Sequence, residues 1–254
     1  MPLTIQYCSD LHLEMDLNRK WINKYPLEVS GDVLLLGGDI MLFAQQEQQN
    51  DFLDYVAKNY QAVYWIPGNH EYYHGDIALR SGTVHEAVRE NVFLVNNTTI
   101  TIDDTDLICS TMWSKISAEN EWQINRAMSD FNVIKNGERM LSVAAYNQLH
   151  EQAKQYIEQA VKSSTAKHKV VLSHHVPTMK NYPPKYKGDV LNEAFAVEMH
   201  DFIEGSDLDY WIYGHTHTNT PDFRIGNTQM VTNQLGYVRH GEHSTFCRNK
   251  TLVF

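Results

Sequence analysis

Cysteine is scarce in this chain of 254 residues. Its three cysteines (Cys8, Cys109 and Cys247) are odd in number and form no CxxC pair, which argues against a disulfide framework. Long apolar runs are lacking too, and stretches such as residues 33–36 are far too short to span a bilayer. The first six residues have neither the basic start nor the apolar run of a signal peptide. We therefore expect a cytoplasmic protein with no membrane segment.

Positive charge is also in short supply. The 31 Asp and Glu residues outnumber the 21 Lys and Arg residues, which gives a net charge of −10. An acidic surface argues against nucleic acid as a partner, because such binding relies on basic residues that neutralise phosphates. A phosphorylated small molecule stays open as a partner, since bound divalent cations reverse the field inside one acidic pocket. The sequence leaves the oligomeric state open.

What the sequence does contain is a repeated unit, in which a short apolar run ends in polar residues. Runs of this kind, rich in Val, Ile and aromatic residues, are typical of buried strands. Five of them are present, at residues 3–8, 32–36, 62–66, 169–172 and 210–213. In α/β sheets, ligands collect beyond the carboxyl ends of the strands, so the five following loops are expected to share one site.

Amphipathic helices are predicted between these strands, over residues 45–60 and 142–161, with Ser142 as the N-cap of the second. Alternating strands and helices indicate a layered α/β fold. Residues 223–231 are predicted to form a hairpin, and residues 251–254 an edge strand. The length and the 43% hydrophobic content fit a single domain over residues 1–254.

One segment, residues 113–147, stands apart because its periodicity is weak and it is rich in aromatic residues. It is either a surface helical excursion or a small helical cap insertion within the domain that shapes substrate choice. The sequence does not decide between these two interpretations.

The polar residues at the five strand ends form a mixed set of oxygen and nitrogen donors. Such a set suits Mn, Fe, Zn, Ni or Co rather than Ca. Seven side chains can serve two cations if one carboxylate bridges them. Each motif alone can be explained by a purely structural role, such as a helix cap at an Asn. Five motifs in succession, each at a strand end, cannot be explained in this way. The set comprises Asp10, His12, Asp39, Asn69, His174, His215 and His217.

These motifs together resemble the calcineurin-like metallophosphoesterase family. They read Asp10-x-His12, Gly38-Asp39, Gly68-Asn69-His70-Glu71, His174 and Gly214-His215-x-His217, and the resemblance runs from residue 4 to about residue 237. It implies a four-layer αββα sandwich of two mixed sheets flanked by helices. It also implies two divalent metal ions, with Mn favoured, and hydrolysis of a phosphate ester by a hydroxide that bridges them.

The resemblance further implies a role for each ligand. Asp10, His12, Asp39 and His217 would hold the first cation, while Asp39, Asn69, His174 and His215 would hold the second. His70 would be the catalytic side chain that faces the substrate, as a general acid or as a stabiliser of developing charge.

Four further residues are expected to support the ligands or to line the substrate pocket. Glu71 would orient His70 or a neighbouring ligand. His174 and His175 are adjacent on a strand and point to opposite sides, so only one of them should ligate. The resemblance implies that the first of the pair, His174, is the ligand and that His175 contacts the substrate or supports the ligands. His74 and Trp113 are the other two candidates.

Within the family, the chain resembles a bacterial branch that carries a Thr-Leu-Trp segment and an Asn-Pro-Arg-Gly-Tyr segment. The corresponding residues here are 111–113 (Thr-Met-Trp) and 233–237 (Asn-Gln-Leu-Gly-Tyr), so the arginine is missing. A phosphate contact made by that arginine would be lost or supplied by Arg239.

The sequence therefore predicts a phosphoesterase that acts on a small-molecule phosphomonoester or phosphodiester. The alternatives are a non-catalytic binding scaffold on the same fold and a nuclease. The complete ligand set argues against the scaffold, and the acidic charge argues against the nuclease.

Overall fold

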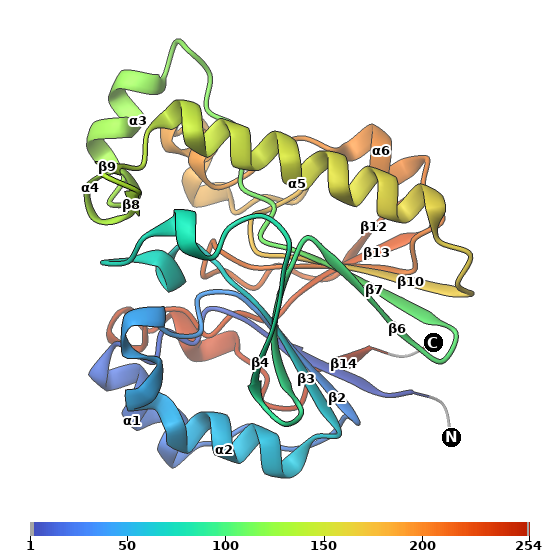
Figure 1. Cartoon of the computed structure of the whole chain (residues 1–254). Helices are drawn as coiled ribbons and strands as arrows, with labels where there is room; N and C mark the ends of the chain where they lie inside the picture. Colours follow the sequence, from blue (N-terminus) through green and yellow to red (C-terminus); the bar gives the residue numbers. More distant parts are fainter. Residues whose placement is uncertain (1–2, 253) are drawn as a thin grey trace.

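Two six-stranded sheets pack face to face, with helices on both outer sides (Figure 1). The structure, a computed structural model, describes residues 3–252 and 254. In spatial order, the first sheet contains β14 (Thr251–Leu252), β1 (Ile5–Cys8), β2 (Val33–Gly37), β3 (Ala62–Ile66), β5 (Val92–Asn96) and β4 (Val84–Arg89). The second sheet contains β12 (Phe223–Ile225), β13 (Thr228–Thr232), β11 (Tyr210–Tyr213), β10 (His168–Ser173), β7 (Thr105–Ser110) and β6 (Thr98–Ile102).

The outer layers are helical, which confirms the predicted four-layer αββα sandwich. Helices α1 (Asp16–Lys24) and α2 (Asn50–Asn59) cover the first sheet, whereas α5 (Val143–Ser163) and α6 (His200–Glu204) cover the second (Figure 1). None of the described helices is both long and apolar enough to cross a membrane. Short 3-10 helices occupy the loops: η1 (Phe43–Gln49), η2 (His70–Tyr72), η3 (Ile77–Leu79), η4 (Pro184–Tyr186), η5 (Val190–Ala194), η6 (Val238–His240) and η7 (Glu242–Thr245).

The core follows the alternation of side chains along each strand. On β2, Val33 and Leu35 point between the sheets, whereas Leu34 and Leu36 point toward the helices. On β10, Leu172 faces the other sheet and Val171 faces the outer helices. Strands buried on both faces can therefore be continuous apolar runs, which is how they are recognised in the sequence.

Most of the predicted elements are confirmed, with one change in a helix. The side chain of Ser142 accepts a hydrogen bond from the Ala145 amide and caps α5 as expected, and the hairpin of β12 and β13 is present. The helix predicted over 45–60 is divided, because residues 45–49 carry no apolar side chain to bury and form η1 instead. Strand β14 pairs with β1 at the sheet edge. Residues 1–2 of the N-terminal stretch and residue 253 of the predicted last strand lie outside the described residues.

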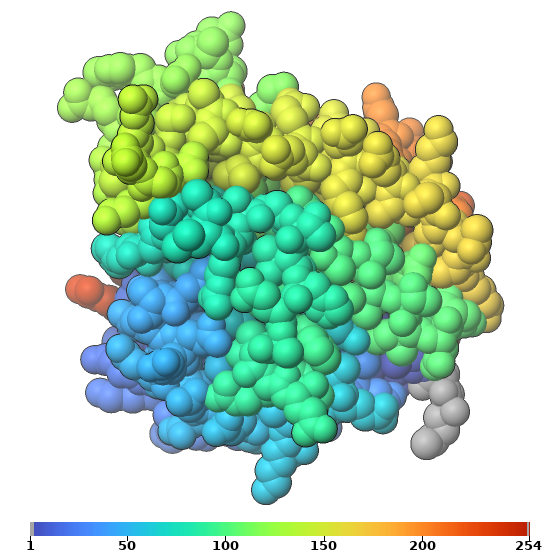
Figure 2. Space-filling view, viewed as in Figure 1, coloured from blue at the N-terminus to red at the C-terminus, as the bar shows by residue number. Residues whose placement is uncertain are grey.

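The segment 113–147 lies beside the ends of both sheets. It contains α3 (Glu121–Ala127), α4 (Asp130–Val133) and a small hairpin of β8 (Lys135–Asn136) and β9 (Arg139–Met140). In the space-filling view, its light-green part projects from the body of the molecule (Figure 2). Its apolar side chains, among them Ile124 and Phe131, form a cluster with Tyr72, Ile77 and Ala194 from other parts of the chain.

Parallel pairing brings the chemically interesting strand ends together. Strands β1, β2 and β3 run parallel in the first sheet, and β10 and β11 run parallel in the second. The carboxyl ends of parallel strands meet at the same edge of a sheet. Here these edges of the two sheets lie at the same end of the sandwich, so the loops that follow the strands come together.

Candidate metal centre

The loops after β1, β2 and β11 have an unusual backbone at the candidate ligands. Non-glycine residues seldom adopt positive φ, and such strain concentrates at functional sites. Each of these turns re-aims a side chain toward the common edge of the two sheets. The candidate ligands concerned are Asp10 (φ 56°), His12 (φ 46°), Asp39 (φ 53°), His215 (φ 75°) and His217 (φ 50°).

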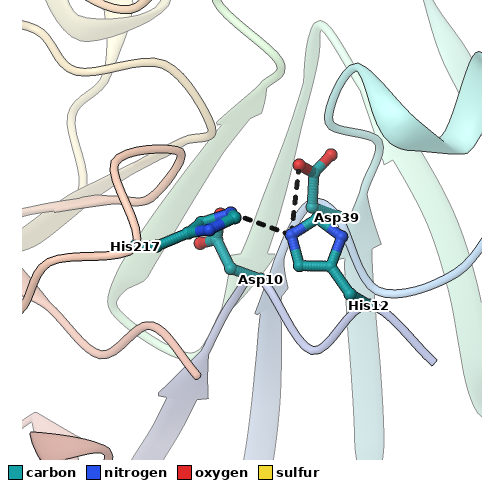
Figure 3. Close-up of side chains that lie close together, drawn as sticks. All are labelled: Asp10, His12, Asp39 and His217. Carbon is teal, nitrogen blue, oxygen red and sulfur yellow. Dashed lines mark hydrogen bonds and ion pairs between the residues drawn. The ribbon is translucent and has the colours of Figure 1, made fainter. Parts of the chain in front are cut away.

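The first group of side chains consists of Asp10, His12, Asp39 and His217 (Figure 3). The Nε2 atom of His12 lies 2.9 Å from Nε2 of His217 and 3.7 Å from Oδ2 of Asp39. The Nε2 atom of His217 also lies 3.4 Å from Oδ1 of Asp10. One donor atom from each residue lies within 4.8 Å of all the others, so the four can surround one ion.

The second group shares Asp39 with the first and adds His174 and His215. The Nε2 atom of His174 lies 3.4 Å from Oδ1 of Asp39 and 3.1 Å from Nδ1 of His215. Asp39 therefore presents Oδ2 to the first group and Oδ1 to the second. A carboxylate placed in this way can bridge two cations.

Asn69 lines the same cleft as Asp39 and His215 of the second group. Its Nδ2 atom donates to Oδ1 of Asp130 at 2.8 Å and to the Tyr73 hydroxyl at 3.2 Å. Its Oδ1 atom is buried and has no hydrogen-bond partner. An unpaired buried oxygen is costly. A cation bound to this oxygen would satisfy it, so the residues present fit a metal site.

The four imidazoles are held in fixed orientations by hydrogen bonds to the ring nitrogen that faces away from the site. In each ring one nitrogen faces the site and the other is hydrogen-bonded, an arrangement common among metal-ligating histidines. His12 Nδ1 pairs with Glu14 (3.1 Å), His217 Nδ1 with Glu242 (2.9 Å), His174 Nδ1 with the Gly37 carbonyl (2.9 Å), and His215 Nε2 with the Ala194 carbonyl (3.3 Å).

Two glycines of the motifs are required by close packing. A Cβ atom on Gly68 would lie 2.2 Å from Oδ1 of Asp39, and one on Gly214 would lie 2.6 Å from Oδ2 of Asp10. Real Cβ contacts are never so short, so any larger residue would displace a candidate ligand. The glycines of Gly68-Asn69 and Gly214-His215 therefore leave room for the donor atoms.

Glu71 fastens two of the ligand loops to each other. Its side chain is fully buried and accepts hydrogen bonds from the backbone amides of Asp39 (2.9 Å), Ile40 (2.8 Å) and Gly68 (2.6 Å), and from the Trp65 indole (3.0 Å). Burial and the nearby Asp39 carboxylate raise the pKa of Glu71 to about 7. The carboxyl thus positions the bridging ligand.

His70 lies next to both groups without belonging to either. Its backbone amide donates to Oδ1 of Asp39 at 2.9 Å, and its ring stacks on Tyr73. Its Nδ1 atom pairs with Oε1 of Glu14 at 3.0 Å, while Nε2 lies 3.4 Å from the Tyr237 hydroxyl. Burial alone would lower the pKa of His70, but the Asp39 and Glu14 carboxylates raise it above its ordinary value.

The pKa values of the four candidate imidazoles are shifted in opposite directions: burial lowers those of His12 and His215, whereas those of His174 and His217 are raised. Burial would lower the pKa of His174, yet the neighbouring Asp39 raises it to about 9. Likewise, hydrogen bonds to Asp10 and Glu242 outweigh burial and raise the pKa of His217 to about 10. Cations would take the place of these protons, because metal binding requires deprotonated ligands.

The remaining predicted residues lie at different distances from the donor atoms. His175 is buried behind the ligands, with its Nε2 atom 3.2 Å from the Tyr146 hydroxyl, and Trp113 packs against its ring. His74 is exposed, and its backbone amide bonds to the Val133 carbonyl, so the structure does not bring it to the site. Arg239 is likewise exposed on η6 and lies outside the cleft described below.

Four residues of the site were missed by the sequence reasoning: Glu14, Asp130, Tyr237 and Glu242. Glu14 follows the Asp-x-His motif by two residues, and this spacing could have suggested it. Tyr237 ends the segment 233–237 that was compared with a family motif, but no role was assigned to it. Asp130 lies on α4 and Glu242 on η7, where no local pattern distinguishes them from surface residues.

A cleft of about 280 Å³ opens over the two groups. Of the described residues that line it, none is a Lys or an Arg. Its floor contains Asp39, Asn69, His70, His215 and His217. Its walls are formed by Tyr73, Ala127, Met128, Ser129, Tyr186, Phe195, Thr216, Tyr237 and Glu242.

Comparison with known proteins places this geometry in a family. Residues 3–219 match the calcineurin-like phosphoesterase family. The chain therefore belongs to that family, and this makes it a metal-dependent phosphoesterase by class.

One relative and one solved structure show how far the likeness extends. An uncharacterized protein of Acanthamoeba polyphaga mimivirus is 30% identical, over 92% of this chain and 91% of that protein. The crystal structure of a phosphopantetheinyl hydrolase from Mycobacterium tuberculosis superimposes with a TM-score of 0.70 at 13% identity, covering 98% of this chain and 95% of that one. At this low identity the second likeness concerns the fold.

Proposed function

We propose that the protein is a dinuclear phosphoesterase that hydrolyses a small-molecule phosphomonoester or phosphodiester. The observation that carries this proposal is Asp39, whose two carboxylate oxygens face two separate sets of donors. Two divalent cations from the group Mn, Fe, Zn, Ni and Co fit these donors, and Mn is our first choice. When bound, the pair would supply an activated bridging water and neutralise phosphoryl charge.

The protein residues would divide the remaining work. Asp10, His12 and His217 would hold one cation, and Asn69, His174 and His215 the other, with Asp39 shared between them. The fixed rings and the strained loops keep the donor atoms in place before the substrate arrives, so little reorganisation is needed.

His70 would deliver a proton to the leaving oxygen. Its Nδ1 atom is engaged by Glu14, which directs Nε2 toward the cleft and the Tyr237 hydroxyl. A positioned general acid of this kind typically contributes about 10²–10⁴ in rate. Glu14 holds His12 and His70 by the same oxygen, and thus links a ligand to the proton donor.

The two alternatives are less well supported. A binding scaffold would not need four oriented imidazoles and an unpaired Asn69 oxygen around a shared carboxylate. A nuclease would need cationic side chains for the phosphates outside the scissile one, and those are lacking among the described residues of the cleft. We also propose that the protein acts in the cytoplasm, where its three free thiols would stay reduced.

A metal-dependent assay on model esters tests the proposal. The chelated protein should hydrolyse neither p-nitrophenyl phosphate nor bis-p-nitrophenyl phosphate, and added Mn²⁺ should restore turnover of at least one. Elemental analysis should find about two cations per active chain. Binding of a single cation at full activity, or turnover that survives complete chelation, would contradict the dinuclear mechanism.

A further inference from the structure

A second, smaller pocket adjoins the reaction cleft. It has a volume of about 120 Å³ and is lined by Tyr182, Tyr186, Asp189, Leu191, Asn192 and Phe195. Tyr186 and Phe195 also line the cleft over the metal groups, so the two spaces share a wall. We call this space the side pocket.

The side pocket lies on the side of the second metal group. The ring of Phe195 stacks on the candidate ligand His215, with ring centroids 4.4 Å apart. The proton donor His70 lies on the other side, where its ring meets the first-group ligand His12 at 4.5 Å. Within the cleft, His70 thus adjoins the first group and Phe195 adjoins the second.

The walls of the side pocket are built before any ligand binds. The Asn192 side chain donates to the Tyr186 carbonyl at 2.7 Å, and the Asp189 carboxylate accepts from the Leu191 amide at 2.9 Å. The Phe195 carbonyl accepts from the Val176 amide at 3.1 Å, which ties the segment to the loop after β10. A preorganised pocket of this kind binds without a large ordering cost.

The lining of the side pocket determines what can enter it. Three aromatic rings and Leu191 favour an apolar group. Asp189 within it and Glu242 in the adjoining cleft disfavour a second anion. A cavity of about 150 Å³ takes up a benzene ring in other proteins, so a single ring or a short branched chain matches the 120 Å³ found here.

We infer that the substrate is a phosphodiester, with its leaving group beside His70 and a small uncharged apolar or aromatic ester group held in the side pocket. This inference rests on the proposed function and narrows it from esters in general to diesters of this type. Hydrolysis would break the bond between phosphorus and the leaving oxygen, with water adding to phosphorus, and leave the apolar group on the phosphomonoester product.

Three esters with the same p-nitrophenol leaving group test the inference kinetically: the monoester, the methyl diester and the phenyl diester. With the Mn²⁺-loaded protein, we expect both diesters to surpass the monoester. The phenyl diester should exceed the methyl diester on the order of tenfold in kcat/KM, the gain from burying most of one ring. Equal kcat/KM values for the two diesters, or a preference for the monoester, would overturn the inference while the proposed function stands.

Substitutions of Leu191 test whether the preference for the phenyl diester arises in the side pocket, because this side chain lines the side pocket and not the cleft. Leu191→Trp should fill the side pocket and abolish the preference for the phenyl diester over the methyl diester. Leu191→Ala, a milder change, should reduce the preference about threefold if the Trp variant does not fold. Leu79→Trp is the matched control, since Leu79 is 81% exposed on η3.

Binding of inert phosphonates separates the two proposals. Calorimetry on the Mn²⁺-loaded protein should show phenylphosphonate binding about tenfold more tightly than methylphosphonate, and Leu191→Trp should remove the difference. If phenylphosphonate binds more tightly but no ester is hydrolysed, the proposed function is refuted, whereas the role of the side pocket in binding is supported. Equal affinities in the wild-type protein would refute the side pocket.

Discussion

The metal centre and the walls around it are built in opposite ways. Every candidate ligand lies within a few residues of a strand end, and five of the seven (Asp10, His12, Asp39, His215 and His217) have a positive φ. A large part of the walls comes from the irregular segments 113–147 and 179–196, which reach the substrate space with Met128, Tyr186 and Phe195. Chemistry is thus placed on rigid elements, and substrate selection is placed on longer loops.

This difference implies that the two regions can change independently. Substitutions at the strand ends should abolish metal binding or turnover for every ester, whereas substitutions in the walls should alter which ester is preferred. Asp130 is where the two regions meet, since it lies on α4 but bonds to Asn69. Four substitutions test this division.

The largest effect is expected for Asp39→Asn. The amide cannot bridge two cations through two anionic oxygens, so both sites should weaken and turnover should fall below detection. Metal content by elemental analysis is the measurement, alongside circular dichroism to check folding. Two cations per folded chain in this variant would rule out Asp39 as the bridge.

His70→Ala should reduce turnover by at least about 10² and keep two cations per chain, because the ring donates a proton without ligating. Steady-state kinetics and metal analysis together separate these effects. His85→Ala is the matched control, since His85 is exposed on β4. If His70→Ala loses its cations and keeps full specific activity when they are resupplied, the assignment as proton donor is wrong.

The candidate ligands at the strand ends could be predicted from the sequence. The apolar runs of β1, β2 and β3 are recognisable because both faces of each strand are buried. The polar residues that follow them must then converge at one sheet edge. Alternation along a strand predicts that only one of His174 and His175 points toward the site, and the choice of His174 came from the family resemblance. In the structure the Nε2 atom of His174 lies 3.4 Å from Oδ1 of Asp39.

The residues that form the walls of the cleft could not be predicted from the sequence in the same way. Phe195 stacks on His215, and Glu242 pairs with His217, only because distant loops fold back over the strand ends. No periodicity records such an approach. His74 shows the converse error, since proximity in sequence to Asn69 suggested a pocket residue, but the positive φ of 62° directs the chain away and leaves the side chain exposed.

A smaller effect is expected for Asp130→Ala. Without its acceptor, the Asn69 amide would lose the contact that turns Oδ1 toward the second group, and supporting contacts of this type are worth about 10–100-fold in metal affinity. Titration with Mn²⁺ should show one weakened site and one unchanged site. Asp130→Asn retains an acceptor oxygen and should restore most of the affinity, while Asp201→Ala on exposed α6 serves as the control. Equal weakening of both sites would mean that Asp130 acts on the fold as a whole.

The smallest effect is expected for Glu193→Gln, which tests whether the two wall segments act as one unit. The Glu193 carboxylate accepts from the Ser117 amide at 2.8 Å, the Ser117 hydroxyl at 3.1 Å and the Asn120 side chain at 2.8 Å, and so ties η5 to the start of the segment 113–147. A neutral amide keeps an acceptor but loses the charge that strengthens these bonds. We expect KM for the phenyl diester to rise a few-fold, with metal content and kcat unchanged. A matching fall in kcat or in bound cations would show that the walls and the metal centre are coupled, and the division between them would fail.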